Sequence, residues 1–167
     1  ASALADEILL VKPGTDAALA LAMMHVIVAH GAWDADFVAR HTLGFDALKA
    51  HLAPMTPAWA AARTGVAAEQ IVHLARRYAA TKPAMIVLGG SSLHKGGNTW
   101  QAARAISCLP ALTGNFGSAG GGIGPRHGGR SHGAGFRDIS AADRRRPGRY
   151  FPNQMEAVVT ALETGAV

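Results

Sequence analysis

Short apolar runs alternate with longer stretches of helical periodicity along the 167 residues of the chain. Residues 8–11 form an apolar run that ends at Lys12-Pro13-Gly14, and residues 84–88 form a second run that ends at a glycine pair. Runs of four or five apolar residues that end at proline or glycine are typical of strands buried in a parallel sheet. The pattern therefore predicts two buried strands, each followed by a turn.

Helical patterns account for most of the remaining chain. Residues 16–29 are apolar on nearly every side, which predicts a helix covered by its neighbours, with Thr15 or Asp16 as its cap. Residues 67–80 carry a single apolar stripe and are the clearest amphipathic helix. The order strand, helix, strand, helix predicts an α/β fold with a parallel sheet. Further helices are predicted over residues 34–40, 45–52, 57–62, 98–112 (with Gly114 as its C-terminal cap) and 154–164.

Composition and charge narrow the class of protein. Hydrophobic residues make up 49% and charged residues 16% of the chain, which excludes an intrinsically disordered protein. The single cysteine, Cys108, excludes a disulfide, a CxxC pair and a cysteine-ligated cluster within these residues. The longest apolar stretch, residues 17–29, is shorter than the roughly 20 residues that a membrane span needs. The arginines of residues 144–149 lack interleaved aromatics and a reader motif, so no nucleic-acid partner is expected.

The segment Lys12-Pro13-Gly14-Thr15-Asp16 joins the first predicted strand to a helix N-terminus. Ligands of open α/β sheets bind at the carboxyl ends of strands, and a helix N-terminus there offers N–H donors to an anion. The carboxylate of Asp16 can accept two parallel hydrogen bonds from the edge of a guanine. The same residue types also form an ordinary helix cap, so both interpretations stay open at this point.

Two glycine-rich segments are further candidates for a binding site. Gly89-Gly90-Ser91-Ser92-Leu93-His94 follows the second predicted strand and matches neither GxGxxG nor a Walker loop, so a nucleotide loop and a tight turn both fit it. Residues 114–135 contain ten glycines interleaved with arginine and histidine, among them Arg126 and His127. Ordering such a segment costs backbone entropy, which a large anionic ligand bound by arginine would offset. A mobile surface loop is the alternative.

These motifs occur together in the order and at the spacing of one known family. The match begins over residues 5–19 and continues through residues 33–38 and the turn Thr64-Gly65-Val66. It is strongest over residues 104–115, which end in Leu112-Thr113-Gly114-Asn115 and are followed by Gly120-Gly121-Gly122. The chain thereby resembles, over nearly its whole length, the molybdopterin oxidoreductases of the dimethyl-sulfoxide-reductase superfamily, which includes formate dehydrogenases and nitrate reductases.

The resemblance implies a fold and a cofactor. The fold would be a Rossmann-like parallel sheet with flanking helices, part of a larger multidomain enzyme. Residues 1–125 would form its dinucleotide-binding part, and residues 126–167 a Gly/Arg-rich return loop and a helix leading into a neighbouring domain. The cofactor would be molybdopterin guanine dinucleotide, two copies of which hold molybdenum or tungsten in this family and support two-electron chemistry.

The resemblance also implies roles for three groups of residues. The first group holds one guanosine end of the cofactor, with Asp16 on the guanine. The second lies near the pterin and the metal pocket. The third matches a stretch that brings an arginine beside the metal in formate dehydrogenases, and it supplies the catalytic candidates. The groups are Gly14, Thr15 and Asp16; Gly90, Ser91, Ser92 and His94; and Arg126 and His127 as catalytic candidates with Gly128 as a cofactor-binding residue.

This sequence departs from the family pattern at two places. Gly129-Arg130-Ser131 replaces a Gln-Asn-Asn pattern of formate dehydrogenases, which disfavours formate as the substrate. No residue matches the metal-ligand position of the family, since Cys108 lies within a predicted helix, and no cysteine motif for an iron–sulfur cluster is present. The metal ligand and a [4Fe–4S] cluster are therefore expected in other parts of the enzyme. The opening Ala1-Ser2-Ala3-Leu4 is typical of a cut within a longer protein.

Two functions remain open from the sequence. The first is the cofactor-binding part of a molybdopterin-dependent oxidoreductase. Its partners would be a small-molecule substrate, the remaining domains of the same enzyme and, as a further candidate, an electron-transfer subunit. On this interpretation the 167 residues alone are inactive. The second is a non-catalytic α/β module that binds a nucleotide or a phosphate.

Overall fold

A computed structural model of the chain describes residues 4–88, 99–124 and 155–165. The chain divides into two compact units, Ala1–Gly128 and Gly129–Val167. The first unit is helix-rich and contains a small parallel sheet. In the second unit the structure describes one helix, α8 (Met155–Glu163), close to the predicted helix over residues 154–164. No helix in the described part of the chain is long and apolar enough to cross a membrane.

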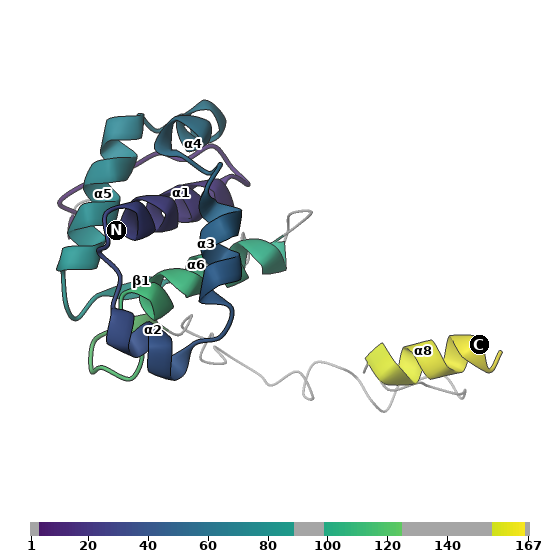
Figure 1. Cartoon of the computed structure of the whole chain (residues 1–167). Helices are drawn as coiled ribbons and strands as arrows, with labels where there is room; N and C mark the ends of the chain where they lie inside the picture. Colours follow the sequence, from purple (N-terminus) through teal and green to yellow (C-terminus); the bar gives the residue numbers. More distant parts are fainter. Residues whose placement is uncertain (1–3, 89–98, 125–154, 166–167) are drawn as a thin grey trace. The chain divides into compact units, whose positions relative to one another are not determined.

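Helix α1 (Asp16–Ala29) is the centre of the first unit, with other helices packed around it (Figure 1). Helices α3 (Phe45–Leu52), α4 (Pro57–Thr64), α5 (Ala68–Ala80) and α6 (Thr99–Leu112) all contact it, and α2 (Ala35–His41) packs against α6. Because apolar residues occur on every side of α1, each contact buries hydrophobic surface. The predicted helix covered by its neighbours is confirmed. Its buried residues are Ala18, Ala20, Ala22, Met23, Met24, Val26 and Ile27.

Local sequence signals set the ends of these helices, and the predicted boundaries are confirmed to within two residues. The carboxylate of Asp34 accepts a hydrogen bond from the N–H of Phe37 at 2.9 Å and so caps α2. Gly114 follows α6 with a φ of +65°, the left-handed conformation that glycine adopts readily. The start of α1 differs from the prediction. The hydroxyl of Thr15 donates to the carbonyl of Lys12 at 2.7 Å instead of capping the helix.

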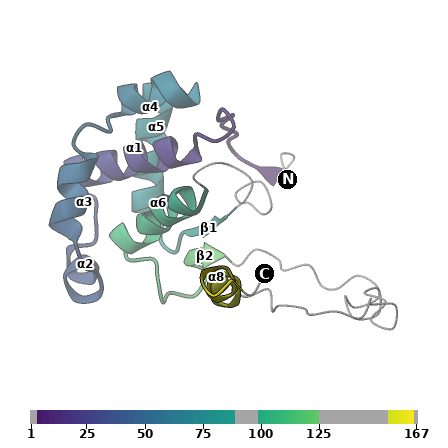
Figure 2. The ribbon, with the colours of Figure 1, turned by 90° about the vertical axis from the view of Figure 1, so that its right-hand side faces the viewer.

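Among the residues that the structure describes, the sheet has two parallel strands, β1 (Met85–Val87) and β2 (Gly122–Gly124), which lie side by side beneath α6 in Figure 2. Met85 pairs with Gly122, and Val87 pairs with Gly124. The α/β class with a parallel sheet is thereby confirmed in a coarse form. Strand β2 falls inside the glycine-rich segment, where the sequence pattern did not predict a strand, because three residues with two glycines carry no strand periodicity.

Two expectations about buried strands are wrong. Residues 8–11 form no strand, since nothing in the described ranges pairs with them, and their side chains alternate in burial: Leu9 and Val11 pack against the core, whereas Ile8 and Leu10 are exposed. Strand β1 exists but is not buried, because its residues also alternate. Ile86 packs on the core, while Met85 and Val87 are 49% and 67% exposed. An unbroken apolar run does not reveal such alternation.

Candidate functional site

The turn that leads into α1 rests on the C-terminal end of α4. The backbone N–H of Lys12 donates to the carbonyl of Thr64 at 3.0 Å. The aliphatic chain of Lys12 lies across Gly65, where a Cβ would come within 3.4 Å of the Cε of Lys12. Gly65 has a φ of +79°. Two segments that the sequence analysis singled out separately, residues 12–16 and residues 64–66, therefore contact each other.

Thr64 makes this support rigid. It is fully buried, and its hydroxyl donates to the carbonyl of Ala60 at 2.9 Å while it accepts from the N–H of Val66 at 3.1 Å. Both capabilities of the hydroxyl are used inside the protein, so the end of α4 and the next residues are held together. The position of the turn at residues 12–16 thus depends on α4.

At the start of α1 the polar groups are open to solvent. Gly14 has a φ of +80°, and no heavy atom lies within 4 Å of the position that its Cβ would take. The carboxylate of Asp16 is exposed, and among the residues that the structure describes it has no hydrogen bond or ion pair. An ordinary side-chain cap, the alternative that the sequence left open, is therefore not formed here by these residues. The first turn offers N–H donors beside a carboxylate acceptor.

The two other predicted groups follow the ends of the parallel strands. Residues Gly90, Ser91, Ser92, His94, Arg126, His127 and Gly128 lie outside the described residues. The strands that precede them are described. Strand β1 ends at Val87, three residues before Gly90, and strand β2 ends at Gly124, two residues before Arg126. Since Val87 and Gly124 are register partners in a parallel pair, the chain leaves both strands at the same edge of the sheet.

The described residues of these regions do not form one bonded cluster. No hydrogen bond or ion pair joins residues 12–16 to strand β1 or strand β2 in the parts of the chain that are described. The turn is tied to α4, and the strands are tied to the end of α6. The two parts of the first unit from which the candidate residues begin, the turn at residues 12–16 and the strand pair, are therefore supported separately.

Sequence reasoning missed a buried polar pair at the end of α6. Thr113 and Asn115 are each 1% exposed, and the side-chain amide of Asn115 donates to the hydroxyl of Thr113 at 2.7 Å. The amide oxygen of Asn115 accepts from the N–H of Ala84, directly before β1, at 2.9 Å. The available signal was the pattern of two polar residues on either side of a glycine that ends a helix. This pattern indicates a helix cap, but it does not indicate that Asn115 bonds to Ala84, far away in the sequence.

A second missed contact joins α2 to the segment before β1. The ammonium of Lys82 lies 2.8 Å from the Oδ2 of Asp34, and the backbone N–H of Asp34 donates to the carbonyl of Leu112 at 2.8 Å. The hydrogen bond from Lys82, together with that from the N–H of Phe37, holds the pKa of Asp34 below its ordinary value. Asp34 thus connects the start of α2, the end of α6 and the approach to the sheet.

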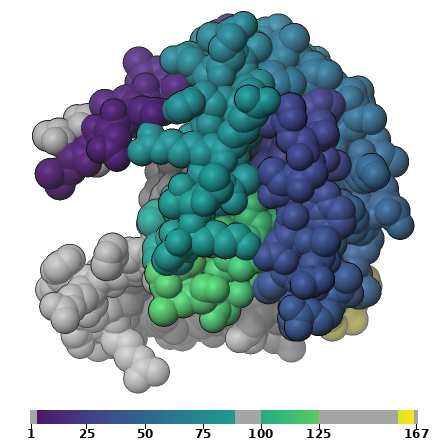
Figure 3. All heavy atoms as spheres, turned by 60° about the vertical axis from the view of Figure 1, so that its left-hand side comes forward, coloured from purple at the N-terminus to yellow at the C-terminus, as the bar shows by residue number. Residues whose placement is uncertain are grey.

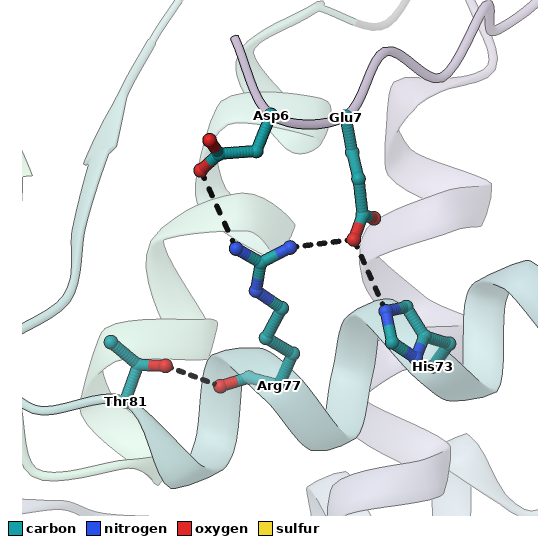
Figure 4. Close-up of polar contacts among 5 residues, drawn as sticks. All are labelled: Asp6, Glu7, His73, Arg77 and Thr81. Carbon is teal, nitrogen blue, oxygen red and sulfur yellow. Dashed lines mark hydrogen bonds and ion pairs between the residues drawn. The ribbon is translucent and has the colours of Figure 1, made fainter.

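The N-terminal segment is anchored to α5 by a surface cluster of charged residues (Figure 4). The carboxylate of Glu7 accepts from the guanidinium of Arg77 and lies 3.2 Å from the Nε2 of His73, while Asp6 lies 3.5 Å from Arg77. The hydrogen bond from His73, followed by the charge of Arg77, lowers the pKa of Glu7. Figure 3 shows the face on which the purple N-terminal segment lies against the teal α5.

Beside this cluster the surface forms an open groove of about 370 Å³. The carboxylate of Glu7 is already bonded to Arg77 and His73. In the described ranges, no group of three or more His, Cys, Asp or Glu side chains is suited to binding a metal ion. The arrangement fits an anchor for the N-terminal segment better than a metal site. The lining residues are Glu7, Ile8, Leu9, Glu69, Gln70 and His73.

Comparisons with known proteins place this geometry in a family context. The family model described as molybdopterin oxidoreductase matches residues 2–162. Over 119 residues the chain is 39% identical to a probable oxidoreductase, YoaE, of Bacillus subtilis. The aligned region covers 71% of this chain and 17% of that protein. It is 36% identical to the dimethyl sulfoxide reductase DmsA of Haemophilus influenzae, covering 72% of this chain and 17% of that protein.

Among solved structures, the acetylene hydratase of Pelobacter acetylenicus is similar, with a TM-score of 0.65 and 34% sequence identity. The similarity covers 69% of this chain and 16% of the hydratase chain. The chain therefore spans about a sixth of the length of the relatives that it matches.

Proposed function

Because the chain belongs to the molybdopterin oxidoreductase family, we propose that it is the cofactor-binding portion of a larger enzyme that carries out two-electron redox chemistry at a molybdenum or tungsten centre. The names of the relatives support this proposal, since they include dimethyl sulfoxide reductases, a thiosulfate reductase and a formate dehydrogenase. They also disfavour the alternative of a non-catalytic nucleotide-binding module.

The proposed cofactor is molybdopterin guanine dinucleotide, and the start of α1 fits its guanosine end. A guanine presents two adjacent N–H donors, which suit an exposed carboxylate such as that of Asp16. The open space at Gly14 lets a ligand approach the backbone, and the first-turn N–H groups of α1 suit the phosphates. When bound, the cofactor would supply the metal at which electrons are exchanged.

The second half of the proposed site is the sheet edge where both glycine-rich segments begin. Gly90, Ser91, Ser92 and His94 would contact the pterin region, and Gly128 the cofactor; Arg126 and His127 are the proposed catalytic residues. What supports this placement is the parallel register of Val87 with Gly124, which starts both segments at one edge. A Rossmann-like completion of the sheet, a dinucleotide-binding part over residues 1–125 and a return segment over residues 126–167 belong to the same proposal.

The remaining parts of the enzyme would supply the other functions. The relatives are about six times longer, which leaves room for further domains, the metal ligand and a [4Fe–4S] cluster. Two relatives are named as subunits of larger assemblies, which supports an electron-transfer subunit as partner. The substrate class is a small molecule, and Gly129-Arg130-Ser131 disfavours formate.

The observation that carries this proposal is the carboxylate of Asp16 at the start of α1, which is exposed and has no hydrogen bond or ion pair to any other residue that the structure describes. In the full-length protein, Asp16→Ala is expected to weaken cofactor binding by roughly tenfold or more, because a hydrogen bond to a charged group contributes about 1.5–3 kcal/mol. Pterin, guanosine and metal content per purified chain are the measurements. Asp46→Ala is the matched control, since Asp46 is an exposed carboxylate in the first turn of α3. Equal cofactor content in both variants contradicts the role of Asp16.

A further inference from the structure

Asn115 is a buried residue that reaches three elements at once. It lies just after α6, it is 1% exposed, and its backbone N–H donates to the carbonyl of Pro110 at 2.9 Å. Its side-chain oxygen accepts from Ala84, the residue before β1, and its side-chain nitrogen donates to Thr113. A buried amide with both ends bonded fixes the groups that it joins, since leaving either partner unpaired carries a desolvation cost.

The backbone of Asn115 also determines the approach to β2. A Cβ on Gly121, the residue before β2, would lie 2.6 Å from the carbonyl oxygen of Asn115, so the two backbones are in direct contact. Only glycine permits such an approach. Asn115 therefore touches the residue that precedes each of the two strands, one through its side chain and one through its backbone.

The sheet has few other means to set its register. Each strand has three residues, and β2 carries two glycines, so cross-strand side-chain pairs are scarce. The N–H of Gly122 donates to the carbonyl of Ala84 at 3.0 Å, and Ala84 is the residue whose own N–H Asn115 holds. A slip of one residue would move every side chain to the other face and would shift one strand end relative to the other.

We propose that Asn115 is a positioning residue for the cofactor site: by bonding Ala84 and packing against Gly121 it sets the register of β1 and β2, and so the places at one edge of the sheet where the two glycine-rich segments begin. The inference rests on the proposed function, because those segments matter only if they contact the cofactor. Among the residues that the structure describes, Asn115 has no hydrogen bond to Gly14, Thr15 or Asp16, and the bond that its side-chain oxygen makes leads to the strands.

The test uses full-length protein carrying Asn115→Ala, with Met24→Ala as the control. Met24 is fully buried in α1, which has no hydrogen bond to β1 or β2 among the described residues, so its truncation leaves a core cavity without removing a contact of Asn115. The two variants are compared under solution conditions at which each has lost the same amount of thermal stability relative to the wild-type protein, so that a general loss of stability affects both equally. In Asn115→Ala, amide hydrogen exchange over residues 85–87 and 122–124 is expected to rise about tenfold relative to that of α1, but not in Met24→Ala.

The second readout is the cofactor itself. Asn115→Ala is expected to lose at least half of its pterin, and the retained metal is expected to give a shifted electron paramagnetic resonance spectrum in its one-electron-reduced state. Met24→Ala keeps both at the wild-type level. Asn115→Asp keeps the acceptor for Ala84, and Thr113 can turn its hydroxyl to donate, so it is expected to restore part of the strand protection. It also serves as the test variant if Asn115→Ala does not fold.

Each outcome decides the proposal. Exchange that rises equally in Asn115→Ala and Met24→Ala overturns the role in register. Strands that loosen while pterin content and the spectrum stay at the wild-type level overturn the link to the cofactor. Wild-type full-length protein that never retains pterin refutes the proposed function instead, and the exchange experiment still decides whether Asn115 sets the register.

Discussion

At the scale of single residues, Gly114 marks a tight junction between α6 and the start of α2. A Cβ at this position would lie 2.5 Å from the Oδ2 of Asp34, the carboxylate that caps α2 and pairs with Lys82. Gly114→Ala therefore combines backbone strain of about 1–3 kcal/mol, from its φ of +65°, with displacement of that carboxylate. We expect a clear fall in the free energy of unfolding, measured by urea titration with circular dichroism.

Gly31→Ala is the matched control for Gly114→Ala. Gly31 has a φ of +64°, and no heavy atom lies within 4 Å of its Cβ position. Both substitutions carry the same backbone strain, so the difference between them isolates the contact with Asp34. Equal losses in the free energy of unfolding would contradict this expectation, because they would show that the side chain of Asp34 moves away from the new Cβ without a measurable cost.

The same residues show what a sequence reveals at this scale. Part of the role of Gly114 and Asp34 is local, because Gly114 ends α6 and Asp34 caps the start of α2. The sequence pattern predicted both of these helix boundaries. Asn115 acts through Ala84, 31 residues earlier, and Asp34 also acts through Lys82, 48 residues later. Such contacts depend on the tertiary fold, and one sequence carries no local signal for them.

At the scale of elements, α1 is packed against four other helices, which leaves little room for added volume at its buried positions. Ala22 is fully buried in it, where α1 meets its neighbouring helices, whereas Ala29 at its end is exposed. Ala22→Leu is expected to lower the free energy of unfolding by about 1–3 kcal/mol, since close-packed interiors resist added methyl groups. Ala29→Leu, on the same helix, is expected to stay within about 0.5 kcal/mol. Urea unfolding of both variants checks this, and a neutral Ala22→Leu would contradict the close packing.

Helices and strands were predictable to different degrees for a physical reason. A helix such as α3 forms its hydrogen bonds within itself, so its periodicity and caps are local, and its predicted range of residues 45–52 is the observed one. A strand needs a partner, and residues 8–11 have none among the residues described. Strand β2 is defined by its pairing with β1, and that pairing begins beside Ala84, whose carbonyl accepts from Gly122 and whose N–H donates to Asn115.

At the scale of the whole molecule, the family was predictable from ordered motifs, while the arrangement of the candidate site was only partly so. The sequence indicated Asp16 as a ligand for guanine, but not that the turn before it rests on Thr64 and Gly65. It indicated the two glycine-rich segments, but not that parallel strands begin both at one edge. These relations join residues far apart in the chain, so they appear only once the fold is known. The roles of the segments themselves stay a prediction.

The activity of the isolated 167 residues tests how the chemistry is divided over the enzyme. The chain spans about a sixth of its relatives, and its one cysteine lies within α6, where its thiol donates to the carbonyl of Arg104. Burial also raises the pKa of that thiol, which disfavours the thiolate that a metal would bind. We expect the isolated chain, supplied with metal and pterin cofactor, to reduce or oxidise no viologen dye, whereas the full-length enzyme does so in the same assay. Turnover by the isolated chain would contradict this division, because the metal would then need a ligand from within these residues.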